Sequence, residues 1–183
     1  RLLADMSLMV MPKIIKLRQL LETLKTDFLI ETVQSLGTED KVIVFCEYMD
    51  TVAFLKEAFQ NVGIGAVSLV GSDNGNSRQR SVDAFQNDPA TRVFIGTTSA
   101  AGVGITLTAA NYVMFASQPW TPAMKRQAED RAYRIGQKRD VFVILPIIPG
   151  TIDEQILALL DSKTEIEASV VERAVCAHLA RGP

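Results

Sequence analysis

The stretch KVIVFCEY, at residues 41–48, is nearly continuous in hydrophobicity and rich in β-branched and aromatic side chains. A strand with one solvated face alternates apolar and polar residues, whereas a strand buried on both faces does not. The stretch therefore predicts a central strand in a sheet that is covered on both sides.

Similar short apolar runs recur along the chain and are separated by segments long enough for crossover helices. The further predicted strands are GAVSLV (65–70), TRVFIGTT (91–98), NYVMFA (111–116) and VFVILPII (141–148). The predicted crossover helices are 50–62, 77–87 and 121–135. This alternation is typical of an α/β fold with a parallel β-sheet covered by helices on both faces.

The chain of 183 residues is 48% hydrophobic, which is sufficient for one well-buried core, and no Pro/Gly/Ser-rich run divides it. We expect a leading helical segment over 1–37, with its helix at 13–37, and a core over 38–150. Trailing helices are expected to pack on the core over 151–183, chiefly at 152–180. The apolar periodicity of both flanks supports these helices.

The formal charge of −2 excludes a global basic field, so contact with nucleic acid requires a local patch, which residues 125–139 provide. The two cysteines lie far apart and form neither a disulfide framework nor a zinc spacing. We expect no metal site on the chain, and nothing indicates a homo-oligomer. Nothing resembles a signal peptide or a membrane span, so the expected location is intracellular.

Two loops after predicted strands attract attention, because function in open α/β sheets gathers at the carboxyl ends of the strands. In TTSAAGVGIT (97–106), Gly102 and Gly104 permit close approach to a ligand or to another backbone, although the stretch taken alone favours a purely structural turn. In VGSDNGNSRQR (70–80), Asn74-Gly75 favours a turn, and Ser77 is expected to cap the next helix. Taken singly, Ser72 and Arg78 are ordinary surface residues.

The most informative stretch is RQAEDRAYRIGQKRD, at residues 126–140. On a helix from about Thr121, Gln127, Arg131 and Arg134 would share one face, and Gly136 would end the helix. Two guanidiniums on one face suit recognition of a polyanion, and phosphoryl transfer is one such task. The alternative is a solvated helix whose arginines pair with Glu129 and Asp130.

In combination, the segments over about residues 13–165 resemble Swi/Snf-related DNA translocases of helicase superfamily two. Gln127, Arg131 and Arg134, followed by Ile135-Gly136-Gln137, resemble the closing helicase motif of that family. The wording QAEDR favours its annealing-helicase branch. The other matching segments, in the family's order, are KVIVFCEYMDTVAFL (41–55), VGSDNGNSRQRSVDAF (70–85), TTSAAGVGITLTAANYVMF (97–115), SQPWTPAMKRQAEDR (117–131) and GTIDEQIL (150–157).

The resemblance implies the second RecA-like lobe, a three-layer sandwich of the P-loop NTPase type, of an ATP-driven motor on double-stranded DNA. Arg131 and Arg134 would be its arginine fingers, with Gln127, Gly102 and Gly104 on the nucleotide side. The residues implied on the DNA side are Ser72, Arg78, Thr97, Thr98 and Trp120. Trp120 has the alternative of a buried anchor beneath the arginine helix.

Three positions depart from the family pattern. Ser99 stands where a basic residue is usual, Ala101 replaces a glycine, and Thr106 replaces an asparagine. The first change is expected to weaken a phosphate contact, and the second restricts the backbone slightly. The third leaves open what takes over the hydrogen bonding of the asparagine.

The chain lacks G-x-x-x-x-G-K-[ST], the phosphate-binding loop that also supplies a magnesium-binding hydroxyl. We therefore expect a fragment that is inactive alone, with ATP and Mg2+ bound mainly by a preceding amino-terminal lobe. The alternatives are a nucleic-acid or protein-binding module on a RecA-like scaffold and a lobe of an RNA helicase. Gln137 and GTIDEQIL argue against the RNA helicase. The expected compartment follows the genome: cytoplasm or nucleoid in a bacterium or virus, nucleus in a eukaryote.

Overall fold

The fold is built on a five-stranded parallel sheet, in a computed structural model that describes residues 2–101, 104–119 and 121–163. The strand order is β2-β3-β1-β4-β5, and every neighbouring pair is parallel. Strand β1 is therefore central, as its unbroken apolar stretch predicts. The strands are β1 (Val42–Cys46), β2 (Gly65–Leu69), β3 (Thr91–Thr97), β4 (Tyr112–Phe115) and β5 (Phe142–Ile144).

Helices connect the strands and flank the sheet. They are α1 (Leu2–Leu24), α2 (Thr26–Ser35), α3 (Met49–Asn61), α4 (Gly75–Asn87), α5 (Thr98–Ala101) and α6 (Pro122–Glu129), followed by a helical segment over 152–163. The predicted α/β fold and all five predicted strands are thus confirmed. Within the described ranges, no helix is both long and apolar enough to cross a membrane.

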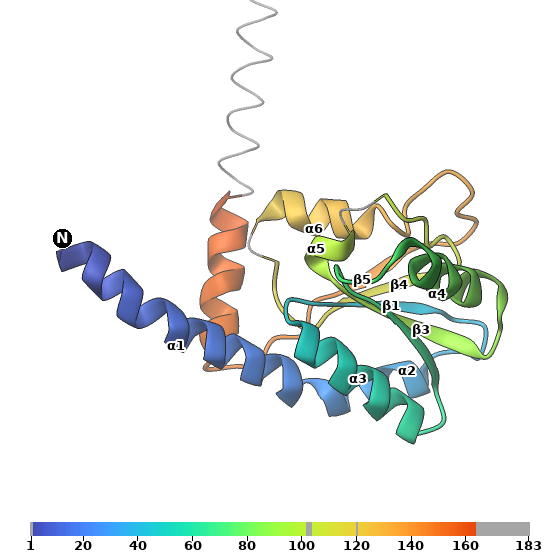
Figure 1. Cartoon of the computed structure of the whole chain (residues 1–183), viewed down its shortest axis with the longest axis horizontal. Helices are drawn as coiled ribbons and strands as arrows, with labels where there is room; N and C mark the ends of the chain where they lie inside the picture. Colours follow the sequence, from blue (N-terminus) through green and yellow to red (C-terminus); the bar gives the residue numbers. More distant parts are fainter. Residues whose placement is uncertain (1, 102–103, 120, 164–183) are drawn as a thin grey trace, which may run out of the picture.

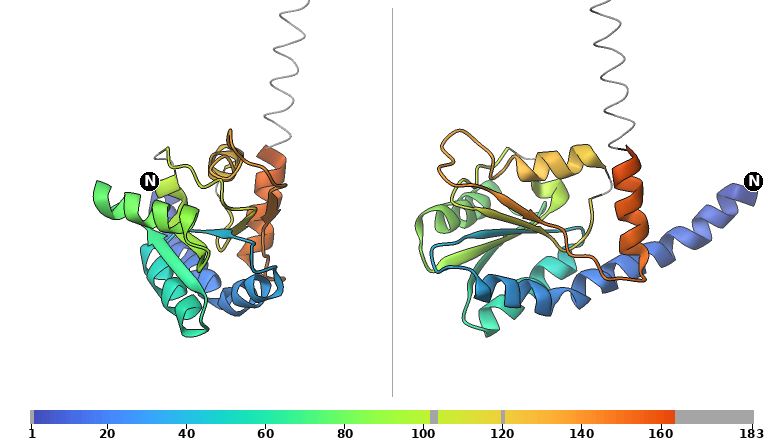
Figure 2. Two further views of the ribbon diagram at one scale, coloured as in Figure 1. Left: turned by 90° about the vertical axis from the view of Figure 1, so that its right-hand side faces the viewer. Right: turned by 180° about the vertical axis from the view of Figure 1, so that it is seen from behind.

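Two hydrophobic cores lie on opposite faces of the sheet, because successive strand residues point to opposite sides. Val42, Val44 and Cys46 of β1 pack with α2 and α3, whereas Ile43 and Phe45 pack with α4, α5 and α6. Figures 1 and 2 show these two helical layers above and below the strands. Strand β1 is fully buried along its length, which explains its lack of polar alternation.

The leading segment differs from its prediction. A single helix was expected over 13–37, but α1 ends at Leu24 and α2 begins at Thr26. Lys25, at the break, is buried, donates through Nζ to Ala116 O at 2.9 Å and pairs with Asp153 at 2.7 Å. These long-range contacts of Lys25 explain why the helix is interrupted at this residue, although the local sequence favours its continuation. The 152–163 helix stands at the end of the sheet between α1 and α6 (Figures 1 and 2), and the rest of the trailing segment lies outside the described residues.

Candidate active site

The arginine-bearing segment is shorter as a helix than its sequence predicts. Helix α6 begins at Pro122 and is capped by Thr121, whose hydroxyl accepts from Met124 N at 3.2 Å. It ends at Glu129 rather than near residue 135. The chain then turns, and the carbonyl of Arg131 accepts from Leu107 N at 2.9 Å. This contact with a distant loop replaces continued helix, so the expected single helical face is wrong. We call residues 130–137 the arginine turn.

Arg131 is buried in the arginine turn, with only 7% of its surface exposed. Its Nε donates to Gln127 O at 3.1 Å, and Nη1 reaches Ile105 O at 3.4 Å. Burial lowers the pKa of Arg131, and the charge of Arg134 lowers it further, while Asp130 opposes the shift. The guanidinium nevertheless stays protonated at neutral pH, because its ordinary pKa lies far above 7.

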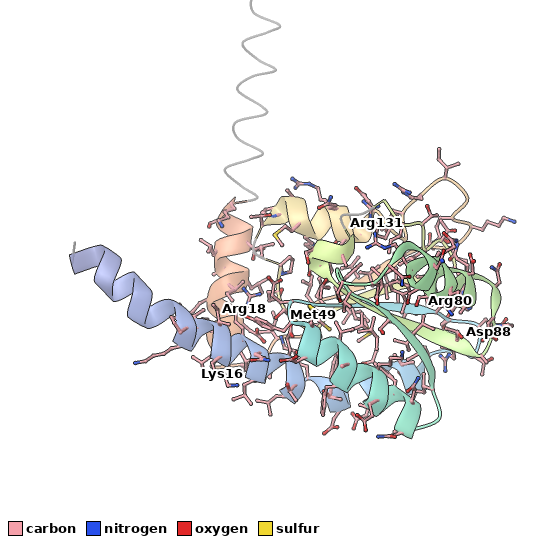
Figure 3. The ribbon with its side chains drawn as sticks, in the orientation of Figure 1. Lys16, Arg18, Met49, Arg80, Asp88 and Arg131 are labelled. Atoms are coloured by element: carbon pink, nitrogen blue, oxygen red, sulfur yellow. The ribbon has the colours of Figure 1, made fainter. Side chains whose placement is uncertain are left out.

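Arg134 is exposed and turns its guanidinium toward the same loop as Arg131. Its Nη1 donates to Gly104 O at 3.3 Å and to the hydroxyl of Thr106 at 2.8 Å. The alternative was pairing of these arginines with Glu129 and Asp130, and no such ion pair occurs among the described residues. Glu129 pairs instead with Lys125 at 3.3 Å. The two arginines thus converge on residues 104–106, even though the helical spacing that suggested it is absent. Figure 3 shows Arg131 beside α5 and α6.

The loop that receives the arginines follows β3 at the carboxyl edge of the sheet, the expected position for a site. Gly104 has φ +66°, a backbone conformation that favours glycine. Thr106, where the family pattern has asparagine, retains a hydrogen-bonding side chain by accepting from Arg134. Ser99 is exposed, and its hydroxyl lies 3.2 Å from that of Thr97. Gly102 lies outside the described residues.

The two threonines predicted on the DNA side are buried at the end of β3. The hydroxyl of Thr97 accepts from Ala100 N at 3.2 Å, and that of Thr98 donates to Cys46 O at 3.2 Å. Both hydroxyls therefore stabilise the turn into α5 in this conformation. Their contact with DNA stays a prediction, as does that of Trp120, which lies outside the described residues.

The remaining predicted site residues lie near the start of α4 and on α6. Ser72 is exposed before α4, Arg78 is partly exposed within it, and Gln127 is exposed on α6. The prediction that Ser77 caps α4 is wrong: Asn74 is the cap, and its side chain accepts from Ser77 N at 2.8 Å. The helix begins two residues earlier than Ser77 because Asn74 offers a cap first.

Two features of the site were not anticipated from sequence. The first is the side chain of Gln137, which bonds both to the arginine turn and to the loop over 104–110. The sequence signal that could have indicated it is the position of Gln137 directly after Gly136, which has φ +106°. The second is a buried set of charges. Arg18, Glu22 and Lys25 of the leading segment are each at most 3% exposed, at a spacing that repeats along one helical face.

A metal site was not expected on this chain. The described part of the chain contains no group of three or more His, Cys, Asp or Glu side chains arranged to hold a metal ion.

A parallel sheet covered by helices on both faces, with polar loops at its carboxyl edge, defines a three-layer α/β fold whose sites gather at that edge. The model of the helicase conserved C-terminal domain matches residues 19–136. The chain therefore belongs to the helicase C-terminal domain family.

Comparison with individual proteins shows which members of the helicase family the chain resembles. The chain is 38% identical over 146 residues to the Zorya protein ZorD of Escherichia coli, covering 76% of this chain and 14% of ZorD. It is 37% identical over 131 residues to the mouse DNA annealing helicase and endonuclease ZRANB3, covering 72% of this chain and 12% of that protein. The Swi/Snf-related resemblance is confirmed, but the near-equal identities do not single out the annealing-helicase branch.

The fold has a solved counterpart in the crystal structure of the C-terminal part of the Fun30 ATPase domain. The TM-score is 0.69 at 32% sequence identity, and the match covers 73% of this chain and 43% of the Fun30 chain. The RecA-like fold expected from the sequence is thereby confirmed. The chain spans only about an eighth to a seventh of the curated relatives named above.

Proposed function

We propose that this chain is the second motor lobe of an ATP-dependent translocase on double-stranded DNA, and that Arg131 and Arg134 are its arginine fingers. ATP would lie between this lobe and a preceding amino-terminal RecA-like lobe of the same protein. Closure of the two lobes on ATP and their reopening after hydrolysis would move the protein along the duplex.

The observation that supports this proposal is the convergence of both guanidiniums on residues 104–106 at the carboxyl edge of the sheet. The described bonds of Arg134 engage only Nη1, whereas a guanidinium has five N–H donors in a planar fork. An exposed arginine with one edge held by its own lobe is well oriented to present the other edge across an interface.

The chemistry assigned to the pair is stabilisation of charge on the transferring phosphoryl group. Such a finger contributes about 10³–10⁵ in turnover in well-studied nucleotide hydrolases. Arg131, buried and twice bonded, would hold the turn and act at short range, while Arg134 would reach further. Gln127, exposed one turn before Arg131 on α6, together with Gly102 and Gly104, would complete the nucleotide side of this lobe.

Double-stranded DNA would be contacted through Ser72, Arg78, Thr97, Thr98 and Trp120. Contacts to phosphate are expected to dominate, because a motor that tracks the backbone must act on any sequence. The Mg2+ that accompanies ATP is assigned to the preceding lobe, since the phosphate-binding loop that holds it in this class is missing from the sequence. The lobe on its own is then inactive.

The direct test is substitution of each arginine in the full-length protein that carries this lobe. We expect Arg131→Ala and Arg134→Ala each to lower DNA-stimulated ATP turnover by about 10³-fold or more. Lysine at either position keeps the charge but loses the planar fork, so Arg131→Lys and Arg134→Lys should restore little.

The matched control is Lys56→Ala, which removes a cation from α3, on the opposite face of the sheet. Turnover should be unchanged in this variant. Normal turnover in both alanine variants would contradict the finger assignment. Such a result would favour the alternative of a nucleic-acid or protein-binding module on a RecA-like scaffold. Salt-dependent binding of duplex DNA by the lobe alone would then support that alternative. Stimulation by single-stranded RNA in place of duplex DNA would favour an RNA helicase.

A further inference from the structure

The side chain of Gln137 makes five polar contacts with backbone groups, and its two amide N–H groups are shared among three carbonyls. Its Nε2 lies within donor distance of three backbone carbonyls: Thr108 at 3.1 Å, Ala110 at 2.8 Å and Ala132 at 3.1 Å. Its Oε1 accepts from the backbone N–H groups of Lys138 and Arg139, each at 3.0 Å. One amide thus uses both ends on backbone groups from three segments.

The backbone around Gln137 explains how its side chain reaches inward. Gly136 adopts φ +106°, which reverses the chain, and Gln137 N donates to Arg134 O at 2.9 Å. This tight turn directs the amide back beneath the arginine turn toward the loop after β3. Because Ala132 lies between the two arginines, its bond to Gln137 fixes the part of the backbone that carries both guanidiniums.

A second glutamine holds the same loop but does not contact the arginine turn in the described residues. Gln86, on α4, accepts from Ala109 N at 2.8 Å and donates to the Thr108 hydroxyl at 3.2 Å. Gln86 and Gln137 therefore anchor adjacent atoms of one loop through equivalent amides. Of these two glutamines, only Gln137 bonds, within the described residues, to the backbone between Arg131 and Arg134, through Ala132 O.

We propose that Gln137 is a positioning residue that joins the arginine turn and the loop over 104–110 into one unit, so that the two guanidiniums move with that loop. This inference rests on the proposed function, because it assigns Gln137 a role in presenting the fingers. It also deepens that function: a displacement of the loop on DNA binding would carry Arg131 and Arg134 with it toward or away from the nucleotide.

The test compares Gln137→Met with Gln86→Met in the full-length protein, since methionine keeps the length of glutamine and removes its hydrogen bonds. We measure kcat and KM for ATP at saturating duplex DNA, together with the Kd for that duplex. Misplacing reacting groups by about 1 Å costs up to about 100-fold in rate, so we expect Gln137→Met to lower kcat by about tenfold or more. KM and the Kd for DNA should change less than about twofold, and Gln86→Met should lower kcat by less than about threefold.

Gln137→Glu is the second variant, because a carboxylate keeps the acceptor for the two N–H groups and loses the donor to the three carbonyls. It should also lower kcat, which keeps the test decisive if Gln137→Met unfolds. Equal kcat losses in the Gln137 and Gln86 variants, or wild-type kcat in Gln137→Glu, would overturn the positioning role. Failure of the proposed function gives a different pattern, in which Arg131→Ala and Arg134→Ala leave turnover intact.

Discussion

At the scale of single residues, the hydrogen bond between Arg134 and Thr106 leads to the most specific prediction. The 2.8 Å bond from Nη1 to the threonine hydroxyl orients an otherwise exposed guanidinium. A free arginine side chain loses about 2 kcal/mol of rotamer entropy when it is fixed, so a bond that fixes it beforehand favours its presentation to a ligand. Thr106 thus keeps a hydrogen-bonding side chain at the position where the family pattern has asparagine.

We predict that Thr106→Val lowers DNA-stimulated turnover in the full-length protein. Valine has the shape of threonine without the hydroxyl, so Arg134 loses its partner while packing is retained. A hydrogen bond with a net value of about 1 kcal/mol corresponds to a roughly fivefold loss in kcat. Thr106→Ser keeps the hydroxyl and should retain most of the activity in the same steady-state assay.

The matched control for this prediction is Thr108→Val, in the same loop. The hydroxyl of Thr108 accepts from Gln86 rather than from an arginine, so its removal should affect turnover little. Equal losses in the Thr106 and Thr108 variants would attribute the effect to general weakening of the loop and contradict the role given to Thr106.

At the scale of secondary-structure elements, α1 and the 152–163 helix are joined to the sheet by buried charges. Arg18 donates to Gln118 O at 2.7 Å, and Glu22 accepts from Glu47 N at 2.5 Å. Burial raises the pKa of Glu22 and lowers the pKa of Lys25, which Asp153 partly restores. Figure 3 shows Arg18 where α1 meets the end of the sheet. The flanking helices therefore hold the backbone that leads from β4 toward α6.

We predict that Lys25→Met lowers the free energy of unfolding by about 3–5 kcal/mol, because it leaves the buried carboxylate of Asp153 without its partner. The double variant Lys25→Met/Asp153→Asn should recover much of that loss. Its neutral amide still accepts from Ile148 N, which bonds to Asp153 at 3.2 Å. Urea-induced unfolding of the four proteins of this cycle gives the coupling energy.

Lys125→Met provides the control, because the Lys125–Glu129 pair is an i, i+4 pair on the partly exposed surface of α6. Its loss should cost less than about 1 kcal/mol. Similar destabilisation by the Lys25 and Lys125 substitutions would show that the buried pair has no special weight in the fold.

The elements themselves were predictable to different degrees. Strand β1 and its neighbours follow from apolar continuity, because burial on both faces leaves a signal in the strand's own residues. The break at Lys25 and the early end of α6 depend on partners far away in the chain, namely Asp153 and Leu107. Local periodicity contains no information about such partners. The shared helical face expected for Gln127, Arg131 and Arg134 was therefore wrong, although both guanidiniums contact residues 104–106.

At the scale of the whole molecule, two hydrophobic cores lie on either side of the sheet, and the loops that follow its parallel strands lie at its carboxyl edge. The sequence indicated this architecture, and the comparison with the Fun30 ATPase structure confirms it. The roles of the residues at that edge could not be predicted with the same force. The same arginine residues can serve only to bond their own loop or can also contact a phosphate, and the sequence is identical in both cases.

The central claim is that this lobe supplies arginines to a nucleotide bound mainly by another lobe. The most direct measurement is ATP hydrolysis with and without duplex DNA, comparing residues 1–183 with the same lobe extended to include the preceding one. We predict turnover only in the extended protein, together with stimulation by duplex DNA. ATP hydrolysis by residues 1–183 alone, or an extended protein that stays inactive with every nucleic acid tested, would contradict the claim.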